Sequence, residues 1–327
     1  NSHFFPQLGI NQEALTGKID HFYDEIFPSL GYVAAQRPEA IRFVKWAFEN
    51  DFLLGIATNP YFPIKAVKHR MIWAGLPAEE YPFALISSYE TFHFTKETPA
   101  YFLEFLAQLG YPEGPVVMVG NDLNVDLLPA QKAGLAIFWI RDQKEPDHPE
   151  ILQGSFQDLQ DWLVKVDPNA ILPQFTSAES ILNLLASTPA ALGTLTRKVK
   201  TKDWRRKPAE DVWCLTEVMC HLRDVEEEIN LPRVKMILGG GNPFLPGVNS
   251  DEWVENRSYI QEDGLAALQS FLETRNQTLR LLGEANMSWD LPARHAIFGP
   301  TTLLELSGIM GGHDRAHVQQ TWKLIQE

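Results

Sequence analysis

Two aspartates, Asp122 and Asp126, stand four residues apart in the stretch MVGNDLNVDLLPA, directly after the apolar run VVMV (116–119). Four β-forming residues followed by a glycine and polar residues predict a buried parallel strand, and ligands of open α/β sheets gather at the carboxyl ends of such strands. Two carboxylates at that position offer the oxygen ligands that Mg²⁺ prefers. The alternative is a loop whose Asp and Asn side chains cap the following helix.

A second constellation consists of histidines. His313 and His317 are one helical turn apart in GGHDRAHVQQ, so their rings project from the same helix face. His221 lies in another predicted helix, TEVMCHLRDVEEE, which a bundle can bring opposite the first. Three imidazoles with open positions for water are typical of a divalent metal site, and Glu227 and Asp314 are candidates for orienting the rings. The alternative is a pair of hydrogen-bonded histidines on a partly buried face.

The first half of the chain alternates short apolar runs with helical segments. The predicted strands are residues 52–60, 83–88, 116–119 and 135–140, and the predicted helices are residues 38–51, 65–76, 98–110 and 127–135. This alternation implies βαβ units and a Rossmann-like α/β parallel sheet. Residues 1–36 are helical without a preceding strand, which predicts a small helical cap.

The second half is helical throughout. Four long amphipathic segments cover residues 178–199, 211–238, 264–285 and 301–326. Four such helices predict an all-α four-helix bundle. Pro168 and Pro173 lie in a stretch without hydrophobic period, which indicates a linker. The predicted organisation is therefore an α/β domain at 1–166, a linker at 167–175 and a bundle at 176–327.

Composition narrows the classes of partner. The 327 residues carry a net charge of −14, which disfavours nucleic acid because phosphates are repelled on average. No apolar run reaches the length of a membrane span, so no membrane partner is expected. Only Cys214 and Cys220 are present, both in an apolar helical segment, which favours a reduced cytoplasmic protein. A homodimer formed through the bundle is a further expectation.

The first half resembles the haloacid-dehalogenase-like (HAD) hydrolases. IATN with Thr58, then Lys96 in FTKETPAYF, then VGNDLNVD with Asp122 and Asp126 are similar in order and spacing to the second, third and fourth motifs of that family. The resemblance implies a Mg²⁺-dependent phosphatase acting on a small phosphorylated substrate. Thr58 and Asn59 would bind phosphate, Lys96 would stabilise developing charge, and the aspartates would hold Mg²⁺.

One family motif is missing. HAD phosphatases attack with an aspartate of a DxDxT motif, and the 327 residues contain no such motif but open directly in cap-like sequence. We expect the nucleophile to lie upstream of Asn1, or the phosphatase chemistry to have been lost. Since the nucleophile strand is central in the family's sheet, we also expect either a separate segment in its place or direct pairing of residues 53–57 with 116–119.

The second half resembles the DinB/YfiT-like metal proteins. CHLRDVE around His221, and HDRAHVQQ with His313 and His317, are similar to the family's histidine on the second helix and its final-helix HxxxH followed by Gln. The resemblance implies a divalent metal such as Zn²⁺ or Ni²⁺ bound by these three histidines. Some relatives are thiol-dependent transferases or isomerases, so the bundle is an alternative catalytic domain. A third alternative is a non-catalytic HAD scaffold with a metal-stabilised bundle for assembly.

Overall fold

The computed structural model describes residues 12–143, 145–284 and 288–326. The chain forms two compact units, one of residues 1–92 with 156–161 and the other of residues 93–155 with 162–327. The predicted boundary at 167–175 stays a prediction, although these residues lie inside the second unit. The predicted cap (1–36) is described only from residue 12 onward.

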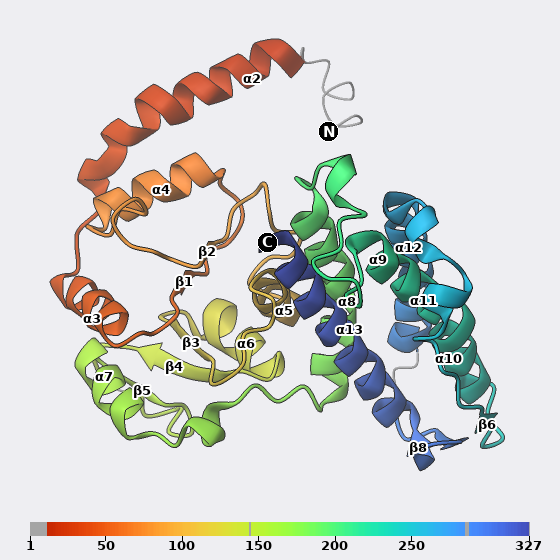
Figure 1. Ribbon diagram of the computed structural model, residues 1–327. Coiled ribbons are helices and arrows are strands. Elements are labelled where there is room, and N and C mark those ends of the chain that lie inside the picture. The colour runs from red at the N-terminus through yellow and green to blue at the C-terminus, as the bar shows by residue number, and fades with distance from the viewer. Residues whose placement is uncertain (1–11, 144, 285–287, 327) are drawn as a thin grey trace. The chain divides into compact units, whose positions relative to one another are not determined.

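The first unit contains helices around a two-stranded sheet (Figure 1). Its elements are α2 (Gln12–His21), the π turn η1 (Phe22–Ile26), the 3-10 helix η2 (Phe27–Val33), α3 (Pro38–Glu49), β1 (Gly55–Ile56), α4 (Ile64–Trp73) and β2 (Leu85–Ile86). The strands pair in parallel, with Gly55 opposite Leu85. Phe27 holds the cap segment against α4, because its ring contacts Trp73 with 5.0 Å between centroids.

The second unit opens with the other predicted α/β elements. They are α5 (Pro99–Gln108), β3 (Val117–Gly120), the π turn η3 (Leu123–Leu127), α6 (Leu128–Lys132), β4 (Ala136–Ile140), β5 (Gln153–Gly154) and α7 (Phe156–Lys165), whose first residues belong to the first unit. Strands β3, β4 and β5 form a parallel sheet in that order. The structure thus contains small parallel sheets at the predicted strands, and β5 is a strand that the sequence pattern did not predict.

One expectation for these strands is wrong, because the residues of β3 are half-buried and not buried. Of the two arrangements expected around the missing central strand, direct pairing of residues 53–57 with 116–119 occurs in no ladder of the described chain, and a separate segment in that place stays a prediction. The expected pairing followed from the cost of burying unbonded amides and carbonyls. β1 is only two residues long and its Gly55 is exposed, so the strand buries too little backbone for that cost to dictate its pairing.

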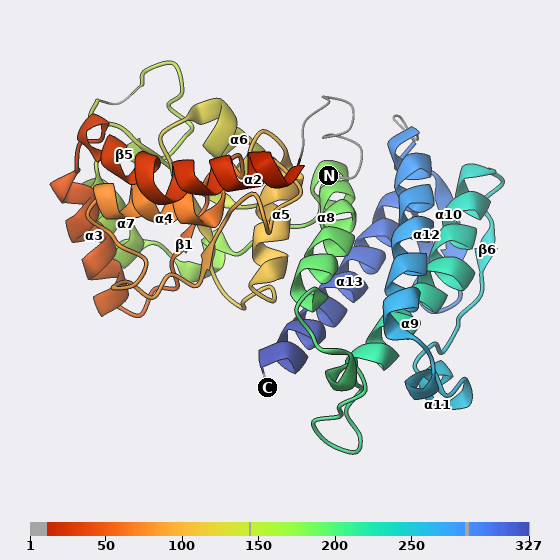
Figure 2. The same cartoon turned by 90° about the horizontal axis from the view of Figure 1, so that it is seen from above.

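Four long helical segments of the second unit form the bundle (Figure 2). They are α8 (Ala178–Thr196), α9 (Leu215–Val225) continued by α10 (Leu231–Leu238), α12 (Gly264–Glu284) and α13 (Leu303–Gln326). A π turn, η6 (Glu226–Asn230), joins α9 to α10 because Pro232 lacks the N–H of a regular helix turn. The predicted four-helix bundle is confirmed.

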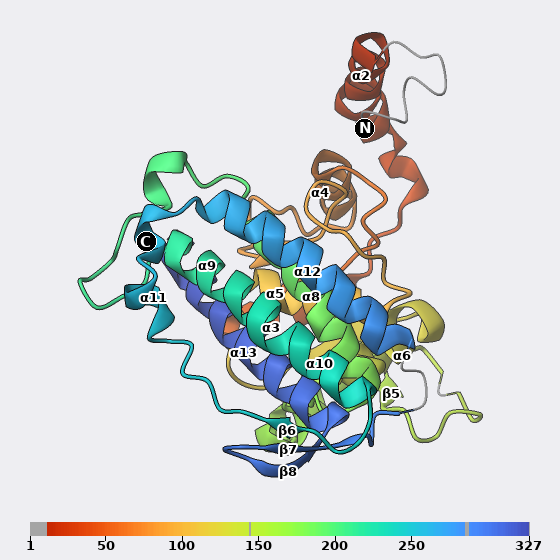
Figure 3. The ribbon, with the colours of Figure 1, turned by 90° about the vertical axis from the view of Figure 1, so that its right-hand side faces the viewer.

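Short elements complete the bundle. They are the 3-10 turns η4 (Pro168–Ile171), η5 (Thr201–Asp203) and η7 (Tyr259–Gln261), the helix α11 (Trp253–Asn256), and the strands β6 (Phe244–Leu245), β7 (Pro292–His295) and β8 (Gly299–Thr302). The three strands form one small sheet at an end of the bundle (Figure 3). Within the described residues, no helix combines the length and apolarity needed to cross a bilayer.

Candidate metal centre

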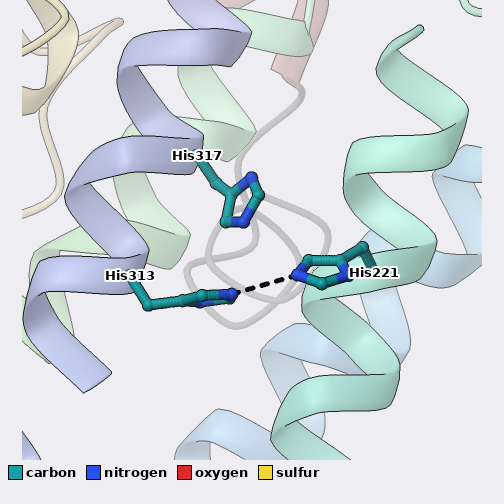
Figure 4. A group of neighbouring side chains, drawn as sticks. All are labelled: His221, His313 and His317. Atoms are coloured by element: carbon teal, nitrogen blue, oxygen red, sulfur yellow. Dashed lines mark hydrogen bonds between the residues drawn. The ribbon is translucent and has the colours of Figure 1, made fainter. Parts of the chain in front are cut away.

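Three histidines converge inside the bundle (Figure 4). His221 comes from α9, and His313 and His317 come from α13. One ring nitrogen of each histidine lies within 4.8 Å of those of the other two, and Nε2 of His221 is 3.0 Å from Nε2 of His313. The structure therefore brings together the three predicted histidines.

The helices explain this convergence. An i, i+4 spacing places His313 and His317 on one face of α13, and α9 packs against that helix and carries the third ring. Trp213, just before α9, lies parallel to the His317 ring at 5.9 Å and 5.0 Å from the His221 ring. Gln320, one turn beyond His317, has its Oε1 2.9 Å from His317 Nδ1. An amide oxygen can only accept, so His317 carries its proton on Nδ1 and directs an Nε2 lone pair to the cluster.

Burial keeps the three rings uncharged. It lowers the pKa of His221 to about 3, with His317 acting in the same direction and Asp224 opposing. It lowers the pKa of His313 to about 2, with further contributions from the neighbouring histidines and Arg275. It also lowers the pKa of His317, against the opposing effect of its hydrogen bond with Gln320. All three are neutral at pH 7, which is the form that binds metals.

The side chains fit a divalent transition metal. Nε2 of His221 and Nε2 of His313 face each other at 3.0 Å, so the two rings direct these nitrogens at one another. Two nitrogens bound to one tetrahedral Zn²⁺ at about 2.0–2.1 Å lie about 3.3 to 3.4 Å apart, a few tenths of an ångström more than the distance seen here. A cation shared by the rings would satisfy both lone pairs, whereas a hydrogen bond between the two nitrogens uses only one of them as acceptor.

The two acids expected to orient the rings do something else. Glu227 Oε1 accepts a hydrogen bond from Ser270 at 2.5 Å and a longer one from Thr274. Asp314 forms an ion pair with Arg275 on α12. Both carboxylates are therefore engaged in contacts between helices, and the expectation that they hold the imidazoles is replaced by these pairings. Gln320 takes the orienting role instead, and sequence patterning singled it out only as part of a motif.

Arg275 connects the helices near the histidines. Its guanidinium pairs with Asp314 on α13, contacts Glu226 Oε2 at 2.8 Å and donates to the Leu185 carbonyl on α8 at 3.3 Å. All three charged side chains are fully buried. Leu185 is four residues before Pro189, so its carbonyl has no helical N–H to accept, and Arg275 fills that role. One arginine on α12 thus binds all three other bundle helices.

Part of the expected phosphate site lies in the second unit. Lys96 is 7% exposed and forms an ion pair with Oδ1 of Asp126. Oδ2 of Asp126 accepts from the amides of Asn121 and Asp122 at 3.1 Å each. Gly120 permits this approach, because a Cβ at that position would collide with the Asp126 side chain.

Asp122 differs from Asp126. It is exposed, and its Oδ1 accepts from the amides of Asn124 and Val125 at 2.9 Å each, which are the contacts of a helix cap. Both of these hydrogen bonds use the same oxygen, so the second oxygen of this solvent-facing carboxylate is available for a cation. The two carboxylates therefore have unequal environments, one buried with a lysine and one facing solvent.

The phosphate-binding candidates lie in the first unit. Thr58 and Asn59 follow β1, and both are half-buried. The buried Ser87 fixes this strand end: its Oγ accepts from the Thr58 amide and donates to the Thr58 carbonyl, both at 2.8 Å. Ser87 was not a sequence candidate, because a serine beside β2 has no distinctive spacing.

Comparison with known proteins identifies the helical half. Residues 184–321 match the profile of the DinB superfamily and form a DinB-like domain. A solved structure, YfiT from Bacillus subtilis, aligns with 46% of this chain and 86% of its own at 18% identity and a TM-score of 0.41. That protein is described as a probable metal-dependent hydrolase with an unusual four-helix bundle topology. None of the curated proteins matches the chain.

Proposed function

We propose that the bundle is a metal-dependent catalytic domain whose centre is His221, His313 and His317. The single observation that carries this proposal is the convergence of three neutral imidazoles, one buried and two half-buried, whose ligand atoms lie within 4.8 Å of one another. Three nitrogen ligands leave open positions on a divalent ion, which is the arrangement of catalytic sites and not of closed structural ones. A bound Zn²⁺ or Ni²⁺ would supply Lewis acidity toward water or a thiol.

The chain's own residues prepare this site. Gln320 fixes the tautomer of His317, and Trp213 covers the parallel face of that ring, which limits access of water from that side. Burial keeps the rings from binding protons that would compete with a metal. The class of reaction that fits is attack of an activated water or thiol on a small electrophile.

Metal content tests the proposal. The purified protein is expected to hold about one divalent transition metal ion per chain, and His317→Ala should lower that content strongly because two imidazoles bind less tightly than three. His148→Ala is the matched control, since this half-exposed histidine lies in a loop and pairs with Glu150. Elemental analysis after dialysis gives the content, and an unchanged value in His317→Ala would contradict the proposed centre.

We infer a second function for the α/β half, a site of the HAD kind that binds Mg²⁺ and a phosphate group. The observation that favours it is the buried pair of Lys96 with Asp126, next to the exposed Asp122. The two aspartates would hold Mg²⁺, and Lys96 would balance charge on a phosphate bound beside them. Mg²⁺ titration followed by NMR of the 120–126 amides tests this, with loss of the response expected in Asp122→Asn.

A further inference from the structure

A basic segment stands out in this acidic chain. Residues 197–207, RKVKTKDWRRK, hold seven of the 28 lysines and arginines and a single acid, Asp203. Like charges so close together repel one another, and this costs stability unless an opposite charge offsets it.

The protein itself offsets only part of this charge. Lys207 pairs with Glu217 at 2.9 Å, and Arg205 donates to the carbonyls of Gln261 and Glu262. Lys198, Lys200, Lys202 and Arg206 are exposed and make no salt bridge with any residue that the structure describes. Four cations of one short connection between α8 and α9 are thus left to solvent or to a ligand.

Three of these four cations line one hollow. The hollow has a volume of about 360 Å³, and Lys198, Lys200 and Arg206 contribute to its wall together with Asp203. Its remaining lining is aliphatic and includes Leu215, at the start of α9, and Leu324 and Ile325, near the end of α13. Lys202 belongs to the same loop but does not line the hollow.

We propose that this hollow binds a small organic anion, with a phosphate or carboxylate head and a compact apolar body. The three cations supply donors for anionic oxygens, and charge-assisted hydrogen bonds of this type are the stronger ones. The aliphatic lining removes an apolar body from water. A volume of about 360 Å³ lies within the range of small-molecule sites.

A concave site for a small ligand fits better than a polyanion. Nucleic acid needs an extended basic surface, and the net charge of −14 repels such a strand on either side of the loop. A small anion in the hollow interacts mainly with the three nearby cations. Salt screens charges that lie farther away than about 8 to 10 Å, so the acidic rest of the chain repels it only weakly.

Binding of phenyl phosphate and of benzoate to the full chain tests the proposal by calorimetry and ligand-observed NMR. We expect at least one of them to bind with a dissociation constant below the millimolar range, and benzylamine, with the same ring and opposite charge, not to bind. Replacing Lys198, Lys200 and Arg206 together by Gln should weaken binding by at least about tenfold, because the loss of even one charged donor costs about that much. Lys202→Gln, the matched control, should change it less than about twofold.

Further variants distinguish binding in this hollow from binding elsewhere on the chain. Affinity for the anion should be retained in His317→Ala, which excludes the histidine centre as the binding group. Ile325→Asn should weaken phenyl phosphate more than inorganic phosphate, because only the former buries a ring there. The proposal is overturned if neither anion binds, or if Lys202→Gln loses as much affinity for the anion as the triple variant does. It is also overturned if a single-stranded oligonucleotide binds tightly and Lys202→Gln weakens its binding as much as the triple variant does.

Discussion

Acid should destabilise this protein through the histidine cluster. The perturbation is a change from pH 7.5 to pH 5 with the metal removed by chelation. In the folded protein the pKa of His221 is about 3 and that of His313 about 2, whereas an unfolded histidine has a pKa near 6.5. Below pH 6.5 the two histidines therefore bind protons in the unfolded chain but not in the folded chain. The free energy of unfolding consequently falls as the pH falls.

The size of the effect follows from the linkage relation. Each group contributes about 1.4 kcal/mol per pH unit between its unfolded and folded pKa values. From pH 6.5 to pH 5 this is about 2 kcal/mol per histidine, or up to about 4 kcal/mol for the two. Asp224 and Glu226 do not add to the loss at pH 5, because their pKa values are lowered in the fold and their contribution disappears only below about pH 4.5.

Urea unfolding at both pH values measures this difference. The variant with His221→Gln and His313→Gln cannot titrate at these positions, so its loss between pH 7.5 and pH 5 should be smaller by up to about 4 kcal/mol. The comparison uses the change with pH within each protein and so cancels any effect of the substitutions on stability at pH 7.5. His148→Ala should behave as the parent. An equal pH dependence in the double variant and the parent would refute the assignment of acid sensitivity to the cluster.

Three further outcomes follow from single contacts. Arg275→Met should cost about 3 to 5 kcal/mol in urea unfolding, because it leaves the buried Asp314 and Glu226 carboxylates without their cation; a loss below about 1 kcal/mol would show that the network is not needed. Gly134→Ala should cost about 1 to 3 kcal/mol by the same assay, since φ is +93° and a Cβ would meet a backbone carbonyl; unchanged stability would mean that this loop adapts. The chain of 327 residues, which has no DxDxT motif, should show no appreciable Mg²⁺-dependent hydrolysis of an aryl phosphate; robust turnover abolished by Asp122→Asn would show that another residue attacks.

The bundle and its histidines were predictable from sequence for a definite reason. A period of 3.6 residues sustained over four segments specifies helices, and a bundle has few ways to bury four apolar faces. The i, i+4 spacing of His313 and His317 then places both on one helix face. The sequence left undetermined only whether His221 lies at the same level of the bundle and faces them. The structure confirms the bundle and brings the three side chains together.

The α/β half was less predictable because its strands are short. An apolar run such as 116–119 predicts a strand but does not say how deeply it is buried or which strand it pairs with. The side chains that position the candidate site residues could not be predicted from the sequence either. Ser87, Trp213 and Gln320 act through contacts between segments far apart in the chain or through one rotamer, and no single-sequence spacing marks such contacts.

Pro189 explains why charged side chains are buried inside the bundle. Pro189 removes one N–H from α8 and leaves the Leu185 carbonyl without a helical partner in a dry core, which costs about 1 to 3 kcal/mol unless a donor reaches it. Arg275 is that donor, and its charge requires carboxylates, which Asp314 and Glu226 supply. Asp314 is the residue after His313, so the same network holds the α13 backbone at the metal centre. The geometry of the histidines is therefore set by contacts within the protein, and we expect the site to be formed before a metal binds.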